Sequence, residues 1–249
     1  MPISQKLTRA VCLVLSTFVM QGAAGGALAE AAPAVHVAKG DRVVFFGDSI
    51  TSQGGGSPLG FINLIRDVLK DRSVSLVNAG IGGNTSSDLL ARIDSDVIVQ
   101  KPSLVVLYIG INDVWRHQNG KGLTREQYEQ NLTSLIDKLK ANQIAVLLCT
   151  PSIIGEQKKN PLDDLLDQFA ATAKTVAERE QVPVCDLHSA FRAYLAEHNP
   201  EDVQHGILTG DGVHMNKAGN VLIASEILKS VGEKELPAEA SDETGKPTN

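Results

Sequence analysis

Two short polar segments, far apart in the sequence, carry the side chains of a nucleophile and its base. Ser49 follows a Gly-Asp pair directly after the apolar run 43–46, whereas Asp211 and His214 stand three residues apart before the last helical stretch. At that spacing the carboxylate can accept from one ring nitrogen and leave the other to take a serine proton. Each segment alone is typical of an ordinary turn. Together they predict a serine hydrolase with Ser49 as nucleophile, His214 as base and Asp211 orienting the histidine.

Acyl transfer also requires donors where negative charge develops on the carbonyl oxygen. A glycine-rich segment, 78–85, follows the second apolar run, and glycines allow a backbone N–H to approach a substrate closely. Asn112 follows the third run, and its side-chain amide can donate to the same oxygen. Each feature alone is common turn chemistry, so both gain meaning only beside the serine and the histidine.

Three further residues, two after the third run and one after the first, bear on the site. Trp115 follows Asn112 closely and is a candidate to contact an acyl or sugar group, although a partly buried surface tryptophan fits the sequence equally well. Asp48 and Asp113 adjoin the proposed catalytic residues, and we expect them to accept hydrogen bonds within their loops rather than to form a carboxylate pair.

Apolar runs of strand length alternate with amphipathic stretches of helix length, which predicts a parallel sheet covered by helices on both faces. Ligands bind such sheets beyond the carboxyl ends of the strands, where the polar segments described above lie. Helix N-termini are expected at Ser57 and Asn160, each followed by proline, at Thr124, which opens a capping box, and at Asn216. The expected strands are 42–46, 74–78, 104–109, 145–149 and 182–185.

The two ends of the chain differ from the central domain, which we place at 41–231. Residues 1–29 are expected to be a signal peptide cleaved after Ala29, since basic residues precede an uncharged stretch and an Ala-Leu-Ala site. The apolar stretch is short and interrupted for a stable membrane span. Residues 30–40 form a leader, and 232–249 is expected to be a disordered polar tail. The predicted location is therefore secreted or periplasmic.

Charge and cysteine content narrow the function classes. The 249-residue chain carries a net charge of −6, which argues against nucleic acid as a partner because phosphates would be repelled. After removal of the signal peptide two cysteines remain, Cys149 and Cys185, too few for a disulfide framework. We expect buried thiols.

The four polar segments, in their order and their positions after the strands, resemble the motif blocks of the SGNH hydrolases, a branch of the GDSL esterase/lipase superfamily. The resemblance covers about Asp41 to Val231. It implies a three-layer, flavodoxin-like α/β/α sandwich with a five-stranded parallel sheet. It also implies an oxyanion hole made by Ser49 N–H, Gly83 N–H and Asn112, with no cofactor and no metal.

These features lead to the expectation of a secreted serine esterase acting on short-chain esters, with acetyl esters of carbohydrate preferred. A lysophospholipase or acyl thioesterase of the same fold is the first alternative. A metallophosphoesterase and a non-catalytic binding module are alternatives from other classes, and the Gly-Ile-Asn-Asp segment at 110–113 lacks the histidine expected of the former. Oligomeric state stays open.

Overall fold

A computed structural model of the chain describes residues 34–233 and Leu236. The predicted signal peptide, its cleavage after Ala29 and most of the predicted tail lie outside the described residues. The strands are β1 (Arg42–Gly47), β2 (Ser75–Gly80), β3 (Leu104–Tyr108), β4 (Ala145–Cys149) and β5 (Val184–Cys185). The α-helices are α1 (Ser49–Gly54), α2 (Phe61–Leu69), α3 (Ser86–Asp96), α4 (Ile111–Trp115), α5 (Arg125–Ala141), α6 (Asp163–Arg179), α7 (Leu187–His198) and α8 (Lys217–Ser230).

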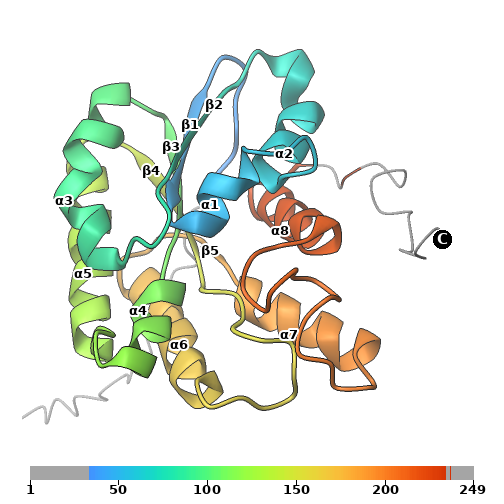
Figure 1. The fold of residues 1–249 in the computed structure, drawn as a ribbon. Helices are drawn as coiled ribbons and strands as arrows, with labels where there is room; N and C mark the ends of the chain where they lie inside the picture. Colours follow the sequence, from blue (N-terminus) through green and yellow to red (C-terminus); the bar gives the residue numbers. More distant parts are fainter. Residues whose placement is uncertain (1–33, 234–235, 237–249) are drawn as a thin grey trace, which may run out of the picture. The chain divides into compact units, whose positions relative to one another are not determined.

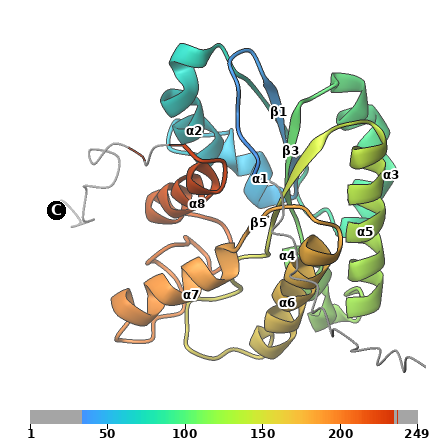
Figure 2. The same ribbon diagram turned by 180° about the vertical axis from the view of Figure 1, so that it is seen from behind.

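The five strands form one parallel sheet in the order β2-β1-β3-β4-β5. Helices α1, α2 and α8 cover one face of the sheet, and α3 and α5 cover the other (Figure 1). The reverse view shows the same layers, with α7 packed beside α8 and α6 beside α5 (Figure 2). This arrangement confirms the predicted three-layer α/β/α sandwich.

The central strands are buried because they are nearly continuous apolar runs, as a sheet covered on both faces requires. All residues of β3 are buried, as are all but the first of β1 and of β4. The edge strand β2 is only half-buried. Each of the five predicted strands is present, with ends displaced by at most two residues.

Two of the predicted helix starts are confirmed by their side-chain hydrogen bonds. The Thr124 hydroxyl accepts from the N–H of Gln127, whose side chain accepts from the Thr124 N–H, so a capping box opens α5. The side chain of Asn216 accepts from the N–H of Gly219 and caps α8, the helix that follows His214.

The other two predicted starts are wrong. Ser57 belongs to a turn in which its carbonyl accepts from Gly60 N–H, and α2 begins only at Phe61. Asn160 likewise forms a turn with Leu162, so α6 begins later than predicted, at Asp163. In both cases the Ser/Asn-Pro pair initiates a turn ahead of the helix, which is the other common use of these residues.

The described ends of the domain and its cysteines pack against the core. Val37 is buried, and the guanidinium of Arg72 forms an ion pair with Glu233.

Cys149 and Cys185 face each other in register as free, buried thiols, and burial raises the pKa of the Cys149 thiol. Within residues 34–233, no helix is long and apolar enough to cross a bilayer.

Candidate active site

The register of the sheet brings three of the predicted loops to one level. Gly47 at the end of β1 pairs with Gly80 on one side and with Tyr108 on the other. Ser49, Gly83 and Asn112 follow these three strand ends within four residues. Because parallel strands all end at the same edge of the sheet, the three segments converge there. A side chain at Gly80 would clash with the backbone of α1, so glycine permits this close approach.

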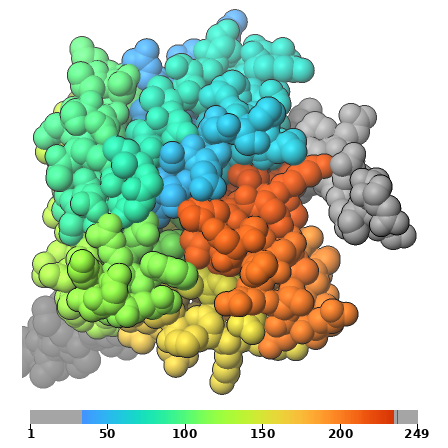
Figure 3. All heavy atoms as spheres, viewed as in Figure 1, coloured from blue at the N-terminus to red at the C-terminus, as the bar shows by residue number. Residues whose placement is uncertain are grey.

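Ser49, His214 and Asp211 form a continuous chain of hydrogen bonds. Nε2 of His214 lies 3.0 Å from Oγ of Ser49, and Nδ1 of His214 lies 2.7 Å from a carboxylate oxygen of Asp211. A carboxylate can only accept, so Nδ1 carries the ring proton and Nε2 presents its lone pair to the serine hydroxyl. In Figure 3 the surfaces of α1 (blue) and of the segment before α8 (orange-red) adjoin on one face. The structure therefore joins all three residues predicted from the two distant segments.

The carboxylate of Asp211 is fixed by its own turn. One of its oxygens accepts from the backbone N–H groups of Val213 and His214, at 3.0 and 2.8 Å. Partial burial alone would raise the pKa of Asp211, but these bonds and the one from the His214 ring outweigh it and lower the pKa to about 2. Asp211 is thus ionised over the whole neutral range and holds the ring in one orientation.

Two predicted oxyanion donors follow neighbouring strands, Gly83 in the loop after β2 and Asn112 in the first turn of α4. Gly83 has a φ of +80°, a conformation that favours glycine, and its N–H donates to no group of the described chain. The Asn112 amide donates to the carbonyl of Asn84 at 3.0 Å and lies 3.5 Å from the Asp48 carboxylate. Asn112 is therefore held next to the nucleophile turn.

Both buried aspartates accept hydrogen bonds, as predicted, but only Asp48 does so within its own turn, whereas Asp113 accepts from a residue 27 positions away. Asp48 caps α1 by accepting from the Ile50 N–H at 2.9 Å, and complete burial raises its pKa to about 7. Asp113 accepts from the backbone N–H and the hydroxyl of Ser86, which ties α4 to α3. Burial raises the pKa of Asp113 to about 6 despite these hydrogen bonds.

Arg92 supports the site and was not predicted from the sequence. Its guanidinium donates to the carbonyls of Gly47 and Ala79 at 2.8 and 2.9 Å and to the Asn84 side chain at 2.7 Å. It thereby ties the serine loop to the glycine-rich loop, and it lies 4.5 Å from the centre of the Phe46 ring. An arginine on a helix gives no sequence signal of such a role, because most helical arginines face solvent.

Glu156 was also missed, and it organises the segment that leads to Asp211. Its buried carboxylate accepts from the backbone N–H groups of Ile207, Leu208 and Thr209, at 2.6 to 2.8 Å, and from the Thr209 hydroxyl. A buried carboxylate needs this many donors to offset its lost hydration. Nothing in the sequence indicated this burial, because Glu156 opens the polar segment Glu-Gln-Lys-Lys-Asn at 156–160.

The residues after Asn112 have separate roles. Arg116 donates to the carbonyl of Gly83 at 2.6 Å and so steadies the glycine-rich loop. A ring nitrogen of His117 lies 2.7 Å from the carbonyl oxygen of Leu123. Trp115 is 40% exposed and lines a cleft that also includes Asp211.

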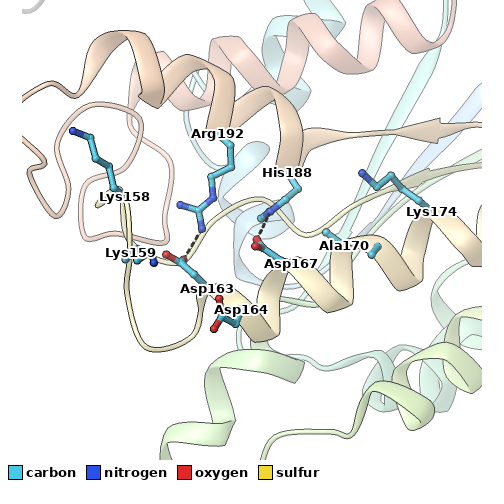
Figure 4. Close-up of a pocket in the computed structure, with 10 residues that line it drawn as sticks. Lys158, Lys159, Asp163, Asp164, Asp167, Ala170, Lys174, His188 and Arg192 are labelled. Atoms are coloured by element: carbon cyan, nitrogen blue, oxygen red, sulfur yellow. Dashed lines mark hydrogen bonds and ion pairs between the residues drawn. The ribbon is translucent and has the colours of Figure 1, made fainter.

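A second histidine–carboxylate pair lies outside this site. A cavity of about 460 Å³ is lined by residues of α6, of α7 and of the segment before α6. Figure 4 shows its lining, in which His188 contacts Asp167 and Arg192 contacts Asp163. None of the three hydrogen-bonded residues Ser49, Asp211 and His214 lines that cavity.

A hydroxyl, an imidazole and a carboxylate joined in this order at the end of a parallel sheet define the class of α/β serine hydrolases. The model of the GDSL-like lipase/acylhydrolase family matches residues 45–222, and the chain belongs to that family. It is a serine carboxylic-ester hydrolase of the SGNH type, as predicted. The metallophosphoesterase and binding-module alternatives receive no support from this assignment.

Several proteins with assigned activities are similar to the chain along most of its length. An acetylxylan esterase from Geobacillus stearothermophilus is 32% identical over 217 residues, 80% of this chain and 97% of the relative. A crystal structure of another acetyl xylan esterase superposes with a TM-score of 0.74 at 38% identity, covering 76% of this chain and 99% of that one. A thioesterase 1/protease 1/lysophospholipase L1 from Escherichia coli is 26% identical, covering 79% of this chain and 86% of its own.

Solved structures of the Geobacillus enzyme include three catalytic variants in which alanine replaces a serine, an aspartate or a histidine. Each superposes with a TM-score of 0.70 at 30% identity, covering 80% of this chain and 98% of that chain. The aspartate and histidine are three residues apart there, as they are here. The types of residue that are catalytic in that relative are those joined here in Ser49, Asp211 and His214.

Proposed function

We propose that this protein is an exported esterase that removes acetyl groups from carbohydrate through a covalent intermediate on Ser49. The observation that carries the proposal is the hydrogen-bond chain from Ser49 through His214 to Asp211. The acetyl preference is supported by the two acetylxylan esterases to which the chain is similar along most of its length. Export is supported by the sequence of residues 1–29.

In the first half of the reaction, Oγ of Ser49 attacks the ester carbonyl carbon while its proton passes to Nε2 of His214. The charge on the carbonyl oxygen is stabilised by the N–H groups of Ser49 and Gly83 and by the Asn112 amide. The tetrahedral intermediate then collapses: the bond to the alcohol oxygen breaks, and His214 returns the proton to that oxygen. Acetyl-Ser49 and a free alcohol remain.

In the second half, water attacks the acetyl carbonyl and gives a proton to His214. The bond to Oγ of Ser49 then breaks, Oγ takes that proton, and acetate leaves. Asp211 keeps the ring in the tautomer that both halves require, because its ionised carboxylate accepts from Nδ1 throughout. The chain's own residues thus supply nucleophile, base and oxyanion donors.

Chain-length preference on nitrophenyl esters tests the acetyl assignment. We expect kcat/KM to be greatest for the acetyl ester and to fall steadily from butyrate to longer acyl groups. A maximum of kcat/KM at acyl groups of eight carbons or more would favour the lysophospholipase or thioesterase alternative. The similarity to the Escherichia coli enzyme supports that alternative. Release of acetate from acetylated xylo-oligosaccharide tests the carbohydrate assignment directly.

Export is tested separately. We expect the protein to be recovered outside the cytoplasm with Glu30 as its first residue. A full-length product retained in the cytoplasm would contradict the proposed localisation and leave the esterase chemistry untouched.

A further inference from the structure

The cleft beside Asp211 has four neutral side chains on its rim without a hydrogen-bond partner in the described part of the chain. It has a volume of about 120 Å³, and its rim includes Trp115, Gln118, Gln157 and Gln204. The side chains of these four residues make no hydrogen bond to any described residue. Gln157 is half-buried and Gln118 and Gln204 are exposed, so all three amides are open to a ligand that enters the cleft. The rim therefore offers an aromatic face and three amides to something outside the chain.

We propose that this cleft binds the sugar from which the acetyl group is removed, with Trp115 contacting the ring and the glutamines its hydroxyls. This inference rests on the carbohydrate esterase function proposed above and assigns a site to its leaving group. A hydroxyl both donates and accepts, and so does a glutamine amide, which makes the three glutamines suited to a neutral polyol. The indole of Trp115, 40% exposed, provides a flat apolar surface of the kind that binding sites use.

The position of the cleft fits the alcohol side of the ester rather than the acyl side. Asp211 and Gly212 line it, and they belong to the same turn as His214, which must protonate the departing alcohol oxygen. Trp115 ends α4, the helix that carries Asn112. Asn112 and His214 do not line the cleft themselves, but each has a lining residue close in sequence, so the proposed complex has its carbonyl oxygen at Asn112 and its alcohol part extending past Asp211 into the cleft.

The charge and size of the cleft select among leaving groups. Among the described residues that line it, Asp211 alone is charged, so they offer no cation to a phosphate-bearing alcohol such as a lysophospholipid headgroup. The volume is well below the several hundred Å³ of a site that encloses a whole ligand. It suits one unit of a chain that continues into solvent, as an oligosaccharide does.

Two other cavities offer fewer such neutral groups, although the side chain of Gln53, which lines one of them, also makes no hydrogen bond to a described residue. In the cavity of Figure 4, His188 and Arg192 are paired with aspartates of the same cavity, and Lys174 is paired with Asp186. A third cavity, of about 370 Å³, is lined by Leu59 and by residues near the start of α8. Its asparagines already hydrogen-bond to the backbone, so it offers less to a polyol.

The single tryptophan of the chain gives a direct test of binding. In the Ser49→Ala variant, titration with acetylated xylo-oligosaccharide should change the emission of Trp115 saturably. We expect Gln157→Ala and Gln204→Ala, each added to that variant, to raise the Kd about threefold, the effect of losing one neutral hydrogen bond. Titration without any change in emission would contradict contact between the sugar and Trp115.

Kinetics test the same claim in the active enzyme. We expect Trp115→Ala to lower the ratio of kcat/KM for acetylated xylo-oligosaccharide to kcat/KM for nitrophenyl acetate about tenfold, mainly through KM. Leu59→Ala, which removes an exposed apolar side chain from the third cavity, is the matched control and should leave the ratio unchanged.

The outcomes separate the two proposals. Hydrolysis of the oligosaccharide by the wild type with the same ratio in Trp115→Ala would overturn the cleft assignment and keep the esterase function. A lowered ratio in Leu59→Ala alone would move the sugar to the third cavity. Failure of the wild type to release acetate from the oligosaccharide, while it hydrolyses nitrophenyl acetate, would overturn the carbohydrate function and the cleft assignment with it.

Discussion

Two aspartate–histidine pairs in this molecule have nearly the same internal geometry. Asp211 lies 2.7 Å from a ring nitrogen of His214, and Asp167 lies 2.8 Å from a ring nitrogen of His188. The side chains of both aspartates are 58% exposed. The histidines differ, because the His214 side chain is 35% exposed and the His188 side chain only 11%.

The third partner separates the two pairs. The second ring nitrogen of His214 lies 3.0 Å from the Ser49 hydroxyl. The second ring nitrogen of His188, whose side chain is drawn in Figure 4, lies 2.7 Å from the carbonyl oxygen of Ser152. A hydroxyl has a proton to give, and a carbonyl can only accept. His214 can therefore act as a base, while the nitrogen of His188 that faces Ser152 must donate and is tied to the backbone. An Asp-His pair alone does not identify an active site.

Replacement of the two histidines should produce the largest contrast. We expect His214→Ala to lower kcat at least about a thousandfold, since the base that activates Ser49 is lost. His188→Ala should lower kcat less than about tenfold. Steady-state hydrolysis of nitrophenyl acetate, with circular dichroism as a control for folding, measures both; equal losses in the two variants would contradict the distinction.

Replacement of the two aspartates should give a smaller contrast of the same kind. Asp211→Asn disturbs the orientation and tautomer of His214 without removing it, so we expect a loss in kcat about tenfold to a hundredfold smaller than that of His214→Ala. Asp167→Asn should change kcat less than about threefold. A full loss in Asp167→Asn, with the fold intact, would mean that the second pair takes part in catalysis.

The free energy of unfolding should be lowered more by replacing His188 than by replacing His214, the reverse of the order for kcat. His188→Ala leaves the buried carbonyl of Ser152 without its donor and should lower the free energy of unfolding by about 1–3 kcal/mol. His214→Ala removes a more exposed side chain and should cost less than about 1 kcal/mol. Urea unfolding of both variants, followed by circular dichroism, gives the two values; a larger loss in His214→Ala would contradict the structural role of His188.

The contrast between exposed and buried carboxylates predicts a pH effect. Asp48 has a pKa of about 7 in the folded state because of burial, against 3.8 for the ordinary residue. The folded state therefore holds an extra proton between about pH 4 and pH 7, and stability falls as pH rises through that window. Asp211, with a pKa of about 2, has the opposite sign and loses its contribution as pH falls from about 4 to 2.

Asp48→Asn isolates the first effect. Relative to the wild type, the variant should gain about 1 kcal/mol or more in free energy of unfolding between pH 5 and pH 8, because an amide has no proton to lose. The charge of Asp113 helps to raise the pKa of Asp48, so the difference reports the titration of Asp48 together with its interaction with Asp113. A difference that stays constant over this range would contradict the raised pKa of Asp48.

The sequence was sufficient to predict what depends on local pattern. Buried strands are visible in the sequence as apolar runs, so β1–β5 could be predicted. The capping box at Thr124 joins residues only three apart, so the start of α5 could be predicted as well. The link between Ser49 and His214 joins residues 165 apart, but both lie at expected positions in a fold whose strand ends converge. Resemblance to a family supplied that fold.

Other features depend on tertiary contacts that leave no local trace. Arg92 reaches Gly47 across 45 residues, and Glu156 reaches Thr209 across 53, so nothing near either residue indicates its partner. Ser57 and Asn160 failed as helix caps because the same residue types also begin turns, and only the surrounding packing decides between the two uses.

Labelling with a fluorophosphonate tests the central claim most directly. The reagent forms a bond from phosphorus to an activated serine oxygen and releases fluoride, and mass spectrometry of the peptides locates the modified residue. We expect modification of Ser49 in the wild type, at a similar rate in His188→Ala, and at a rate at least about a hundredfold lower in His214→Ala. Modification of another residue, or an unchanged rate in His214→Ala, would contradict the assignment of Ser49 and His214 as nucleophile and base.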